Sequence, residues 1–533
     1  MKKCTIIFIA VILFTFLSKN IYATTSFNVQ RKSLKIYEKF DISQILTTDS
    51  KNLKYTSSDK NIATVDENGI IFTKKQGQFI INATDENSST SCTFSSGYYV
   101  GIDVSSWNNA IDWKKVKKSG VDFAMIRSSY GWYDEETDKD EEYDFQYDKK
   151  LLDNLKGASE NEISFGIYHF SYAKNKEEAL LEAEYVLNAI DNYGKEYKEK
   201  MSLPIAYDVE YISNLSQKEL TDIVSTFCSK IYEAGYTPIV YSNKNFFVNH
   251  LDVEKLNALA YNLWYANYQE NPDFSEKITI ADTNISPMIW QYTQSGDIDG
   301  ANTDDGHVDL DILYMKDRVK ITIENEGKIE DIIGVDKGTK VSELPVLSKI
   351  GYTFDGYKDK NGNSILQDYV YTKDITLVPV FKKIPITSII PEKEKIDVVD
   401  KRTYKININK VEPETAILDG EELVYESDDT TIATVDKNGN VTPLKDGICN
   451  IKCYIKSNPT ISTNITIDIH FGYIRGDLDK NDIVDANDAA IVLDLYKYNN
   501  ATDEQLKIAD IDKNGIIDAN DAALILDIYK YGN

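Results

Sequence analysis

The chain has 533 residues, with 86 acidic and 59 basic side chains that give a formal net charge of −27 at pH 7. This length exceeds what one hydrophobic core supports, so several domains are expected. The acidic charge argues against general binding of nucleic acid, which needs a basic field. The four histidines, at positions 169, 250, 307 and 470, lack the spacing of a zinc site, which argues against a metallopeptidase.

Residues 1–23 have the pattern of a secretory signal peptide. Two lysines precede an apolar run from about Thr5 to Leu17, and a polar break leads to Ala23. We expect cleavage after Ala23 and secretion from a bacterium. No later apolar run approaches the length of a membrane span, so we expect none in the mature chain. Cys449 and Cys453 lie in one strand-like run, roughly 13 Å apart, which is too far for a disulfide.

Two distant segments repeat each other. Residues 55–69 return as residues 425–439, and Gly77 corresponds to Gly447. Each copy has short alternating strands and an Asn-Gly turn, which is typical of a β-sandwich. Both copies resemble bacterial Ig-like domains of group 2, so we expect such domains at 24–96 and 385–471. The resemblance implies spacing or surface attachment rather than catalysis.

Residues 97–317 alternate between two patterns. Strand-like runs cover 99–104, 123–127, 163–170, 203–210, 238–241, 262–266 and 288–292, and helical patterns cover 112–119, 175–190, 216–234 and 252–260. This alternation predicts a barrel of parallel strands covered by helices. Active residues of such barrels lie at the carboxyl ends of the strands.

One strand-like run ends on two acids, Asp208 and Glu210. Because successive side chains of a strand alternate, both acids point to the same side, roughly 7 Å apart. Two carboxylates in one cleft are what glycoside hydrolysis requires. The same tripeptide recurs from Asp252 to Glu254, where the following residues predict the first turn of a helix.

Seven short motifs follow one another in this segment. They are Gly101–Trp107, Ile111–Trp113, Gly166–Phe170, Pro204–Glu210, Trp264–Tyr268, Trp290–Tyr292 and Val308–Leu310. In this order they resemble family 25 glycoside hydrolases, the N-acetylmuramidases (lysozymes) that act on peptidoglycan. The resemblance implies an irregular, flattened β/α-barrel. It also implies hydrolysis of the β-1,4 bond between N-acetylmuramic acid and N-acetylglucosamine, with no cofactor for catalysis.

Carried over by position, Glu210 matches the general acid that protonates the leaving oxygen. Asp208 matches the carboxylate beside it, and Asp103 and Asp309 match acids that complete the floor. Like charge and burial raise the pKa of one carboxyl in such a group until it can donate a proton. The N-acetyl group of the substrate can attack the anomeric carbon while Asp208 stabilises the positive charge. A direct nucleophilic role for Asp208 stays open.

Aromatic residues near the strand ends are candidates for stacking on sugar rings. They are Tyr168, Trp264, Tyr268, Trp290 and Tyr292, and each has an alternative as a core residue. His169 is predicted to be structural, and Ser105 lacks the His–Asp relay of a nucleophile. The acidic stretch from Asp134 to Asp144 is predicted to be a solvated loop rather than a metal site.

Residues 318–384 form a small β-rich unit in which Gly351–Tyr357 precedes Asp374–Phe381. This pattern resembles the Listeria–Bacteroides repeat of cell-surface proteins. The resemblance implies a stalk-like module, and a simple spacer is the alternative.

Residues 472–533 contain two loops in phase. Oxygen side chains stand at loop positions 1, 3, 5 and 12, with a backbone carbonyl at position 7, as a calcium loop requires. The predicted ligands of two structural Ca²⁺ ions are Asp477, Asp479, Asn481, Ile483 and Asp488, and Asp510, Asp512, Asn514, Ile516 and Asp521. Each loop ends on Asp and precedes one helix, which resembles half of a type I dockerin. Asp482 stands where the turn favours Gly.

The dockerin resemblance implies a cohesin-domain protein as partner. Loop positions 10 and 11 usually select that partner, and here they are Ala486 and Asn487, then Ala519 and Asn520. Their identity in the two halves predicts two symmetry-related binding poses.

The sequence thus predicts a multidomain, secreted muramidase. We expect an irregular β/α-barrel flanked by β-sandwich (Ig-like) domains, a small β-rich repeat and an α-helical calcium-binding dockerin that tethers the chain. One alternative is a non-catalytic glycan-binding surface or adhesion protein, against which the acids at 103, 208, 210 and 309 argue. The other is a phage-type endolysin, against which the signal peptide, stalk modules and dockerin argue.

Overall fold

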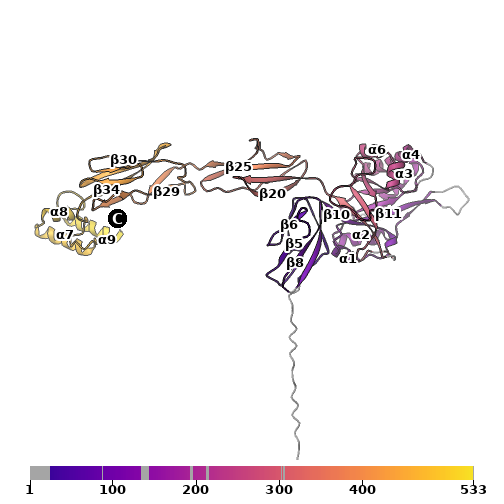
Figure 1. Ribbon diagram of the computed structural model, residues 1–533, viewed down its shortest axis with the longest axis horizontal. Helices are drawn as coiled ribbons and strands as arrows, with labels where there is room; N and C mark the ends of the chain where they lie inside the picture. The colour runs from indigo at the N-terminus through magenta and orange to yellow at the C-terminus, as the bar shows by residue number, and fades with distance from the viewer. Residues whose placement is uncertain are drawn as a thin grey trace, which may run out of the picture. The chain divides into compact units, whose positions relative to one another are not determined.

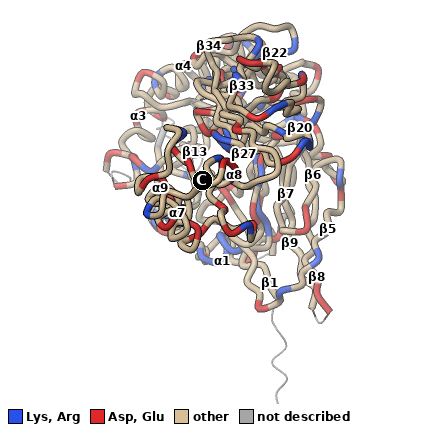
Figure 2. The backbone as a smooth tube through the Cα atoms, turned by 90° about the vertical axis from the view of Figure 1, so that its left-hand side faces the viewer, with Lys and Arg blue, Asp and Glu red and all other residues tan. Residues whose placement is uncertain are grey.

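The computed structural model describes residues 25–86, 88–133, 143–192, 196–211, 215–301, 303, 306–341 and 343–531. The predicted signal peptide and residues 134–142 of the acidic stretch lie outside these ranges. The chain divides into two compact units, 1–342 with 367–376 and 343–366 with 377–533. Acidic and basic residues are both spread over the chain (Figure 2). Within the described ranges, none of the helices is long and apolar enough to cross a membrane.

The first unit contains a closed barrel. Its strands are β10 (Tyr98–Val104), β11 (Phe123–Tyr133), β13 (Ser164–Phe170), β14 (Ile205–Asp208), β15 (Pro238–Asn243), β16 (Asn262–Ala266), β17 (Ile289–Gly296) and β18 (Val308–Tyr314). Pairing of β10 with both β11 and β18 closes the barrel, and β12 (Tyr143–Tyr147) extends β11. The predicted strand-like runs are confirmed.

The last strand corrects the expectation of a fully parallel barrel. β18 runs antiparallel to both of its neighbours, β10 and β17. Its amino end therefore lies at the rim where the parallel strands have their carboxyl ends. Asp309, the second residue of β18, pairs directly with Asp103 of β10. The reversal brings an acid to the rim from the start of a strand.

Helices cover the outside of the barrel (Figure 1). They are α1 (Trp113–Lys118), α2 (Leu151–Glu160), α3 (Lys176–Asn192), α4 (Gln217–Glu233), α5 (Lys244–Asn249) and α6 (Val253–Ala258). The helical predictions correspond to α1, α3, α4 and α6, while α2 and α5 were not predicted. Asp252 caps α6 by accepting a hydrogen bond from the Lys255 amide. The second copy of the tripeptide is thus a helix start, as predicted.

Apolar side chains fill the inside of the barrel and the layer beneath the helices. Phe123, Met125, Ala206, Ile239 and Ile289 lie in the interior cluster. A Cβ atom on Gly101 would lie 2.3 Å from the Phe123 ring, so only glycine at this position leaves room for the ring. A filled interior confines any ligand to the rim.

Two sandwich-like segments share one strand order. In the first segment, one sheet has the strand order β2 (Arg31–Leu34), β9 (Ser89–Ser96), β8 (Gly77–Thr84), β5 (Lys54–Ser57). Its other sheet has the order β3 (Lys39–Asp41), β7 (Ile70–Thr73), β6 (Ala63–Val65). In the second segment, the corresponding sheet has the order β27 (Lys395–Val398), β34 (Asn458–Ile469), β33 (Gly447–Ile455), β30 (Leu423–Ser427). Its other sheet has the order β28 (Tyr404–Lys405), β32 (Asn440–Pro443), β31 (Ala433–Val435). Both also have a short extra pair, β1 (Ser26–Phe27) with β4 (Leu46–Thr47) and β26 (Ser388–Pro391) with β29 (Ile408–Glu412).

Gly77 and Gly447 show why the repeat preserves glycine. Both have φ +147°, and a Cβ atom would lie 2.5 Å from Ile62 in the first copy and 3.0 Å from Ile432 in the second. The structural repeat predicted from the sequence is therefore confirmed by strand order and by this contact.

The β-rich segment 318–384 is divided between the two units. The first unit holds the hairpin of β19 (Arg318–Asn325) and β20 (Lys328–Asp336) and the pair β21 (Thr339–Lys340) with β24 (Val370–Tyr371). In the second unit, β22 (Tyr352–Asp359) pairs with β23 (Ser364–Ile365) and with β25 (Ile375–Lys383).

The carboxyl-terminal segment is helical. It contains α7 (Ala486–Tyr498), α8 (Asp503–Ala509) and α9 (Ala519–Tyr531) around a small core that includes Val492 and Ile525. The four cysteines of the described ranges are buried and free, including Cys449 and Cys453.

The first sandwich packs against the barrel through a buried carboxyl group. Asp122 accepts hydrogen bonds from Ser33 Oγ (2.5 Å) and from the amide of Val100 (3.0 Å). Nearby Gly120 has φ +85°, and a Cβ atom there would lie 2.4 Å from the carbonyl oxygen of Arg31. Burial raises the pKa of Asp122, and the Ser33 bond opposes this. The segment is thus anchored on the barrel.

Ser33→Ala is expected to destabilise the first unit by about 1–3 kcal/mol, because a buried carboxyl group loses a donor. Urea unfolding checks this, with Ser91→Ala on the exposed part of β9 as the control, for which a change within about 0.5 kcal/mol is expected. Equal effects of the two substitutions would contradict the role of the Ser33 contact.

Candidate active site

A cleft of about 510 Å³ opens at the rim of the barrel. All four predicted acids line it: Asp103, Asp208, Glu210 and Asp309. They come from β10, from β14 and the residues after it, and from β18. The strand order therefore gathers carboxyl groups that are about 200 residues apart in the sequence. This is the arrangement that the motifs predicted.

A fifth acid, Asp311, lies in the floor and was not predicted. It is fully buried and accepts a hydrogen bond from Trp264 Nε1 (2.7 Å). Its carboxyl group is within hydrogen-bonding reach of Asp103, which in turn accepts from Gln291 Nε2 (2.8 Å). A signal was available, since Asp311 follows Asp309 by two residues and so lies on the same face of β18.

The contact between the buried carboxyl groups of Asp103 and Asp311 favours the protonated form of one of them. Asp311 Oδ2 is buried, and no N–H or O–H group among the described residues donates a hydrogen bond to it. Two carboxyl groups in contact and away from water cannot both be ionised at low cost. Burial, followed by repulsion from neighbouring carboxylates, raises the pKa of Asp103 well above its usual range. Burial also raises the pKa of Asp311 to about 8.

Asp208 is held rigidly and has one unused acceptor. It is 5% exposed, and its carbonyl oxygen accepts from the Ser171 amide (2.9 Å). Its side-chain oxygen Oδ1 is buried and has no partner within the described ranges. Burial, and then the charge of Glu210, raise the pKa of Asp208 well above its usual range, while Arg127 opposes the shift. Oδ1 is therefore suited to accept a donor from a ligand.

Glu210 lies just beyond the end of β14 and lines the same cleft. Burial raises its pKa, while hydrogen bonds from Asn243 and Tyr241 oppose the shift. Burial and the charge of Glu210 raise the pKa of Asp309 to about 6. The cleft thus contains acids that keep protons closer to neutral pH than free carboxyl groups do, which is what acid catalysis needs.

A buried network supports the strand that carries Asp208. Glu182 of α3 accepts hydrogen bonds from Ser171 Oγ (2.8 Å) and from the Tyr207 hydroxyl, and lies 3.3 Å from His169 Nε2. His169 also bonds Ser129 Oγ (2.8 Å). His169 does not line the cleft, in agreement with a structural role. Glu182 was not predicted, because one acid among several in a helix gives no signal.

The five candidate aromatic residues separate into two groups. Tyr168 and Trp264 line the cleft, and the 47% exposed Tyr268 donates to Gln291 Oε1 (2.8 Å). Trp290 and Tyr292 instead lie in a buried cluster with Tyr98 and Tyr314. Because Gln291 faces the cleft, its neighbours on β17 face away from it. The prediction for Trp290 and Tyr292 therefore needs correction, and their core alternative holds.

Other cleft residues were missed. Trp107, Arg127, Phe170, Tyr241 and Gln291 also line the cleft. Each lies in one of the quoted motifs or at the end of a predicted strand, so its position was a usable signal.

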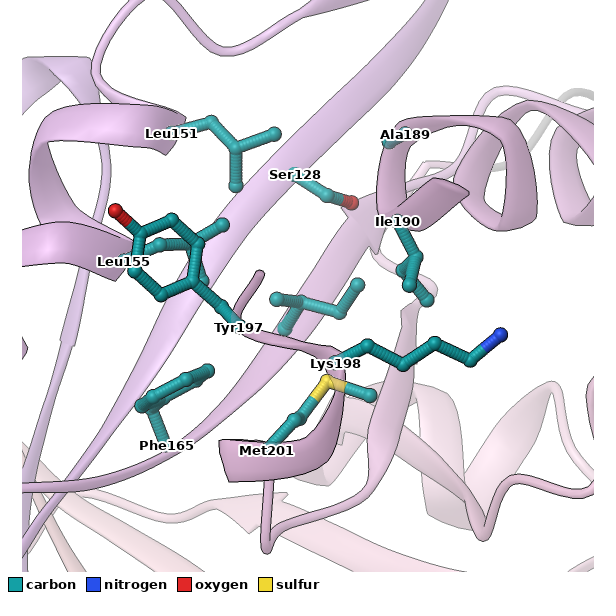
Figure 3. A pocket seen from close by; sticks show the side chains of 10 residues that line it. Ser128, Leu151, Leu155, Phe165, Ala189, Ile190, Tyr197, Lys198 and Met201 are labelled. Atoms are coloured by element: carbon teal, nitrogen blue, oxygen red, sulfur yellow. The ribbon is translucent and has the colours of Figure 1, made fainter. Parts of the chain in front are cut away.

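A second cavity is an unsuitable active site. It measures about 20 Å³ and lies among α2, α3, β11 and β13. Figure 3 shows Leu151, Leu155 and Phe165 around it together with Ile190 and Met201. None of the described residues that line it carries a carboxyl group.

The two C-terminal loops gather carboxyl oxygens. Those of Asp477, Asp479 and Asp488 lie within 4.8 Å of one another, as do those of Asp510, Asp512 and Asp521. Ile483 and Ile516 have exposed side chains, consistent with use of their backbone only. Asp482 has φ +66° where its counterpart Gly515 has φ +86°, so the first loop places a side chain in a conformation that favours glycine. Asn481 in the first loop and Asn514 in the second are the remaining side-chain members of the predicted calcium-ligand sets.

Asp311→Asn is expected to gain thermal stability relative to the wild type as pH rises from about 4, the ordinary pKa of Asp. The raised pKa means that the folded state holds a proton which the unfolded chain releases, so the wild type loses stability up to about pH 8. Melting temperatures at several pH values check this.

Asp309→Asn is the matched control. Because the pKa of Asp309 is about 6, the effect of this substitution on the melting temperature should stop growing near that pH. A pH-independent difference between Asp311→Asn and the wild type would contradict the shared proton.

Comparison with known proteins agrees with this geometry. Residues 102–301 match the model of glycosyl hydrolases family 25. The chain is 28% identical to the uncharacterized protein YegX of Escherichia coli O6:H1 over 45% of this chain and 74% of the relative. It is 25% identical to the autolytic lysozyme of Clostridium acetobutylicum, over 52% and 74%. It is 28% identical to the lysozyme of Streptococcus phage Cp-7, over 37% and 54%.

The matched range includes Asp103, Asp208 and Glu210, and ends before Asp309 and Asp311. The family match, the barrel fold and the cluster of carboxyl groups all indicate the same class of enzyme. Residues 102–301 therefore resemble the glycosyl hydrolases of family 25, and the chain is a glycoside hydrolase.

Proposed function

We propose that the chain is a secreted muramidase that hydrolyses the β-1,4 bond between N-acetylmuramic acid and N-acetylglucosamine in peptidoglycan. The observation that carries the proposal is the cluster of buried carboxyl groups with raised pKa values in the cleft of the family 25 domain. Similarity to lysozymes supports the choice of bond. A protein that only binds glycan has no use for such a cluster, because buried acids cost stability.

In this mechanism Glu210 is the general acid. Its protonated carboxyl group donates to the glycosidic oxygen as the bond to the anomeric carbon breaks. The carbonyl oxygen of the substrate's 2-acetamido group then attacks that carbon from the opposite face. Water opens the resulting ring with Glu210 as the base, so the anomeric configuration is retained.

Asp208 orients the acetamido group. The N–H of that group fills the unused acceptor Oδ1, and the negative charge stabilises the positive charge that develops during attack. The donor also favours the ionised form of Asp208 once substrate binds. The shared proton of Asp103 and Asp311 limits the remaining negative charge in the floor.

Glu210→Gln is expected to lower the release of reducing ends from purified cell walls by about 10²–10⁴-fold, because the amide cannot donate the proton. The melting temperature should stay close to that of the wild type.

Glu254→Gln is the matched control, since Glu254 ends the same tripeptide but is exposed on α6. Wild-type activity of Glu210→Gln would refute the assignment. An inactive wild type on every peptidoglycan tested would refute the proposed function as a whole.

We also propose that the C-terminal helical segment is a dockerin that binds two Ca²⁺ ions. The ligand sets are the predicted ones, with Asp477, Asp479 and Asp488 in the first loop and Asp510, Asp512 and Asp521 in the second. Hard carboxylate and carbonyl oxygens in this number suit calcium. The bound ions would neutralise the acids and hold α7 and α9 in place.

A cohesin-bearing protein is the proposed partner of this segment. Ala486 and Asn487 on α7 and Ala519 and Asn520 on α9 are exposed at equivalent places. Further exposed apolar residues recur in both helices, namely Leu493, Tyr496 and Tyr498, and Leu526, Tyr529 and Tyr531. The duplication supports two equivalent docking poses, and a tethered location outside the cell.

Calorimetric titration is expected to give two Ca²⁺ per wild-type chain and one for Asp510→Ala, which removes the first ligand of the second loop. Asp494→Ala, a change on α7 outside both loops, should keep two. A wild-type stoichiometry of zero, or two ions bound by Asp510→Ala, would contradict the assignment.

A further inference from the structure

A second groove adjoins the catalytic cleft. It measures about 540 Å³ and is lined by Ser106, Trp107, Arg127, Tyr130, Lys149, Phe170 and Tyr172. Trp107, Arg127 and Phe170 line both spaces, so the groove continues the cleft along the rim. A polymer lying in the catalytic cleft can therefore extend into this groove.

The groove exposes a large aromatic side chain on a fixed support. Trp107 is 77% exposed and lies on the short helix η2 (Ser106–Asn108). Ser105 and Asn108 form a capping box around this turn. The buried Asp148 accepts the Ser106 amide (3.0 Å) and the Arg127 guanidinium (2.8 Å). A rigid backbone that keeps an indole in water is a prepared surface for a ligand.

Three further residues that line the groove are aromatic as well. The rings of Phe170 and Tyr172 lie 5.3 Å apart, and the Tyr172 amide donates to Glu182 (3.0 Å). Tyr130 lies 5.3 Å from the Arg127 guanidinium. Rings of this kind offer flat apolar faces to a sugar, while the buried Glu182 fixes the backbone that carries them.

The charge of the groove is opposite to that of the cleft. Four carboxyl groups line the cleft, whereas none of the described residues that line the groove carries one. Arg127 is neutralised by Asp148, with which it forms an ion pair at 2.8 Å. Lys149 is exposed, and no carboxylate within the described ranges pairs with it. In a chain with a formal charge of −27, an exposed lysine beside the active site favours an anionic ligand group.

We propose that this groove is a subsite for a carboxylate-bearing part of the glycan strand. The aromatic rings stack on a sugar beyond the cleaved bond, and Lys149 pairs with the carboxylate. The inference rests on the proposed function, since muramic acid supplies such groups. The carboxylate belongs either to the lactyl ether of muramic acid, where no peptide is attached, or to the peptide, where one is.

The test compares three substrates made from one peptidoglycan. The first keeps its peptides, the second has lost them to an amidase and exposes the lactyl carboxylate, and the third has had its carboxyl groups reduced to alcohols. Reducing-end assays with wild type, Lys149→Gln and Lys149→Arg give kcat and KM. The matched control is Lys114→Gln, an exposed lysine on α1 outside the groove.

Lys149→Gln is expected to raise KM about tenfold on carboxylate-bearing strands, the size of one charge-assisted hydrogen bond, with kcat unchanged. Lys149→Arg should restore most of this loss, and Lys114→Gln should match the wild type. On reduced strands all variants should behave alike. A loss confined to peptide-bearing strands assigns the carboxylate to the peptide. A loss confined to stripped strands assigns it to the lactyl group, which is an amide wherever a peptide is attached, and a loss on both shows that Lys149 pairs with either carboxylate.

Stacking is tested separately by binding. In the Glu210→Gln background, a disaccharide-peptide should quench tryptophan fluorescence, and Trp107→Phe should remove most of the quenching. If Lys149→Gln has wild-type KM on all strands, or an equal loss on reduced ones, the subsite is refuted while the proposed hydrolysis stands. An inactive wild type would instead refute the proposed function.

Discussion

The active site depends on carboxyl groups that are buried next to one another. A buried carboxylate is costly, and two in contact are costlier, so the site holds protons that free acids would release. The reversed strand β18 creates this condition, because it places Asp309 and Asp311 beside Asp103. The parallel strand β14 brings Asp208 to the same rim. Strand direction, rather than any single residue, sets the acidity of the cleft.

The surrounding fold supplies what holds these groups in place. The inside of the barrel is filled with apolar side chains, so the strand ends cannot collapse inward. Gln291 and Trp264 donate to the floor, and the network around Glu182 fixes the start of the loop after β13. The buried acids at the rim thus destabilise the fold, and the packed layers beneath them compensate for this, as is usual for enzymes.

Much of this site could be predicted from the sequence. Alternation of strand and helix patterns gave the barrel, and the spacing of Asp208 and Glu210 gave their common face. The direction of β18 could not be predicted, because the sequence of a single short strand carries no mark of its direction. Trp290 and Tyr292 were misplaced for a related reason. Aromatic residues suit both a core and a sugar-binding surface, and only the face occupied by Gln291 decides between them.

The contact between Ser33 and Asp122 has a consequence for how the enzyme comes apart. A module joined only by a linker unfolds independently of its neighbour, whereas one that shares buried polar contacts does not. Residues 25–96 should therefore melt together with the barrel in one cooperative step. A protease that meets the native chain would find no early cut between them, so the catalytic barrel keeps its amino-terminal partner for as long as it stays folded.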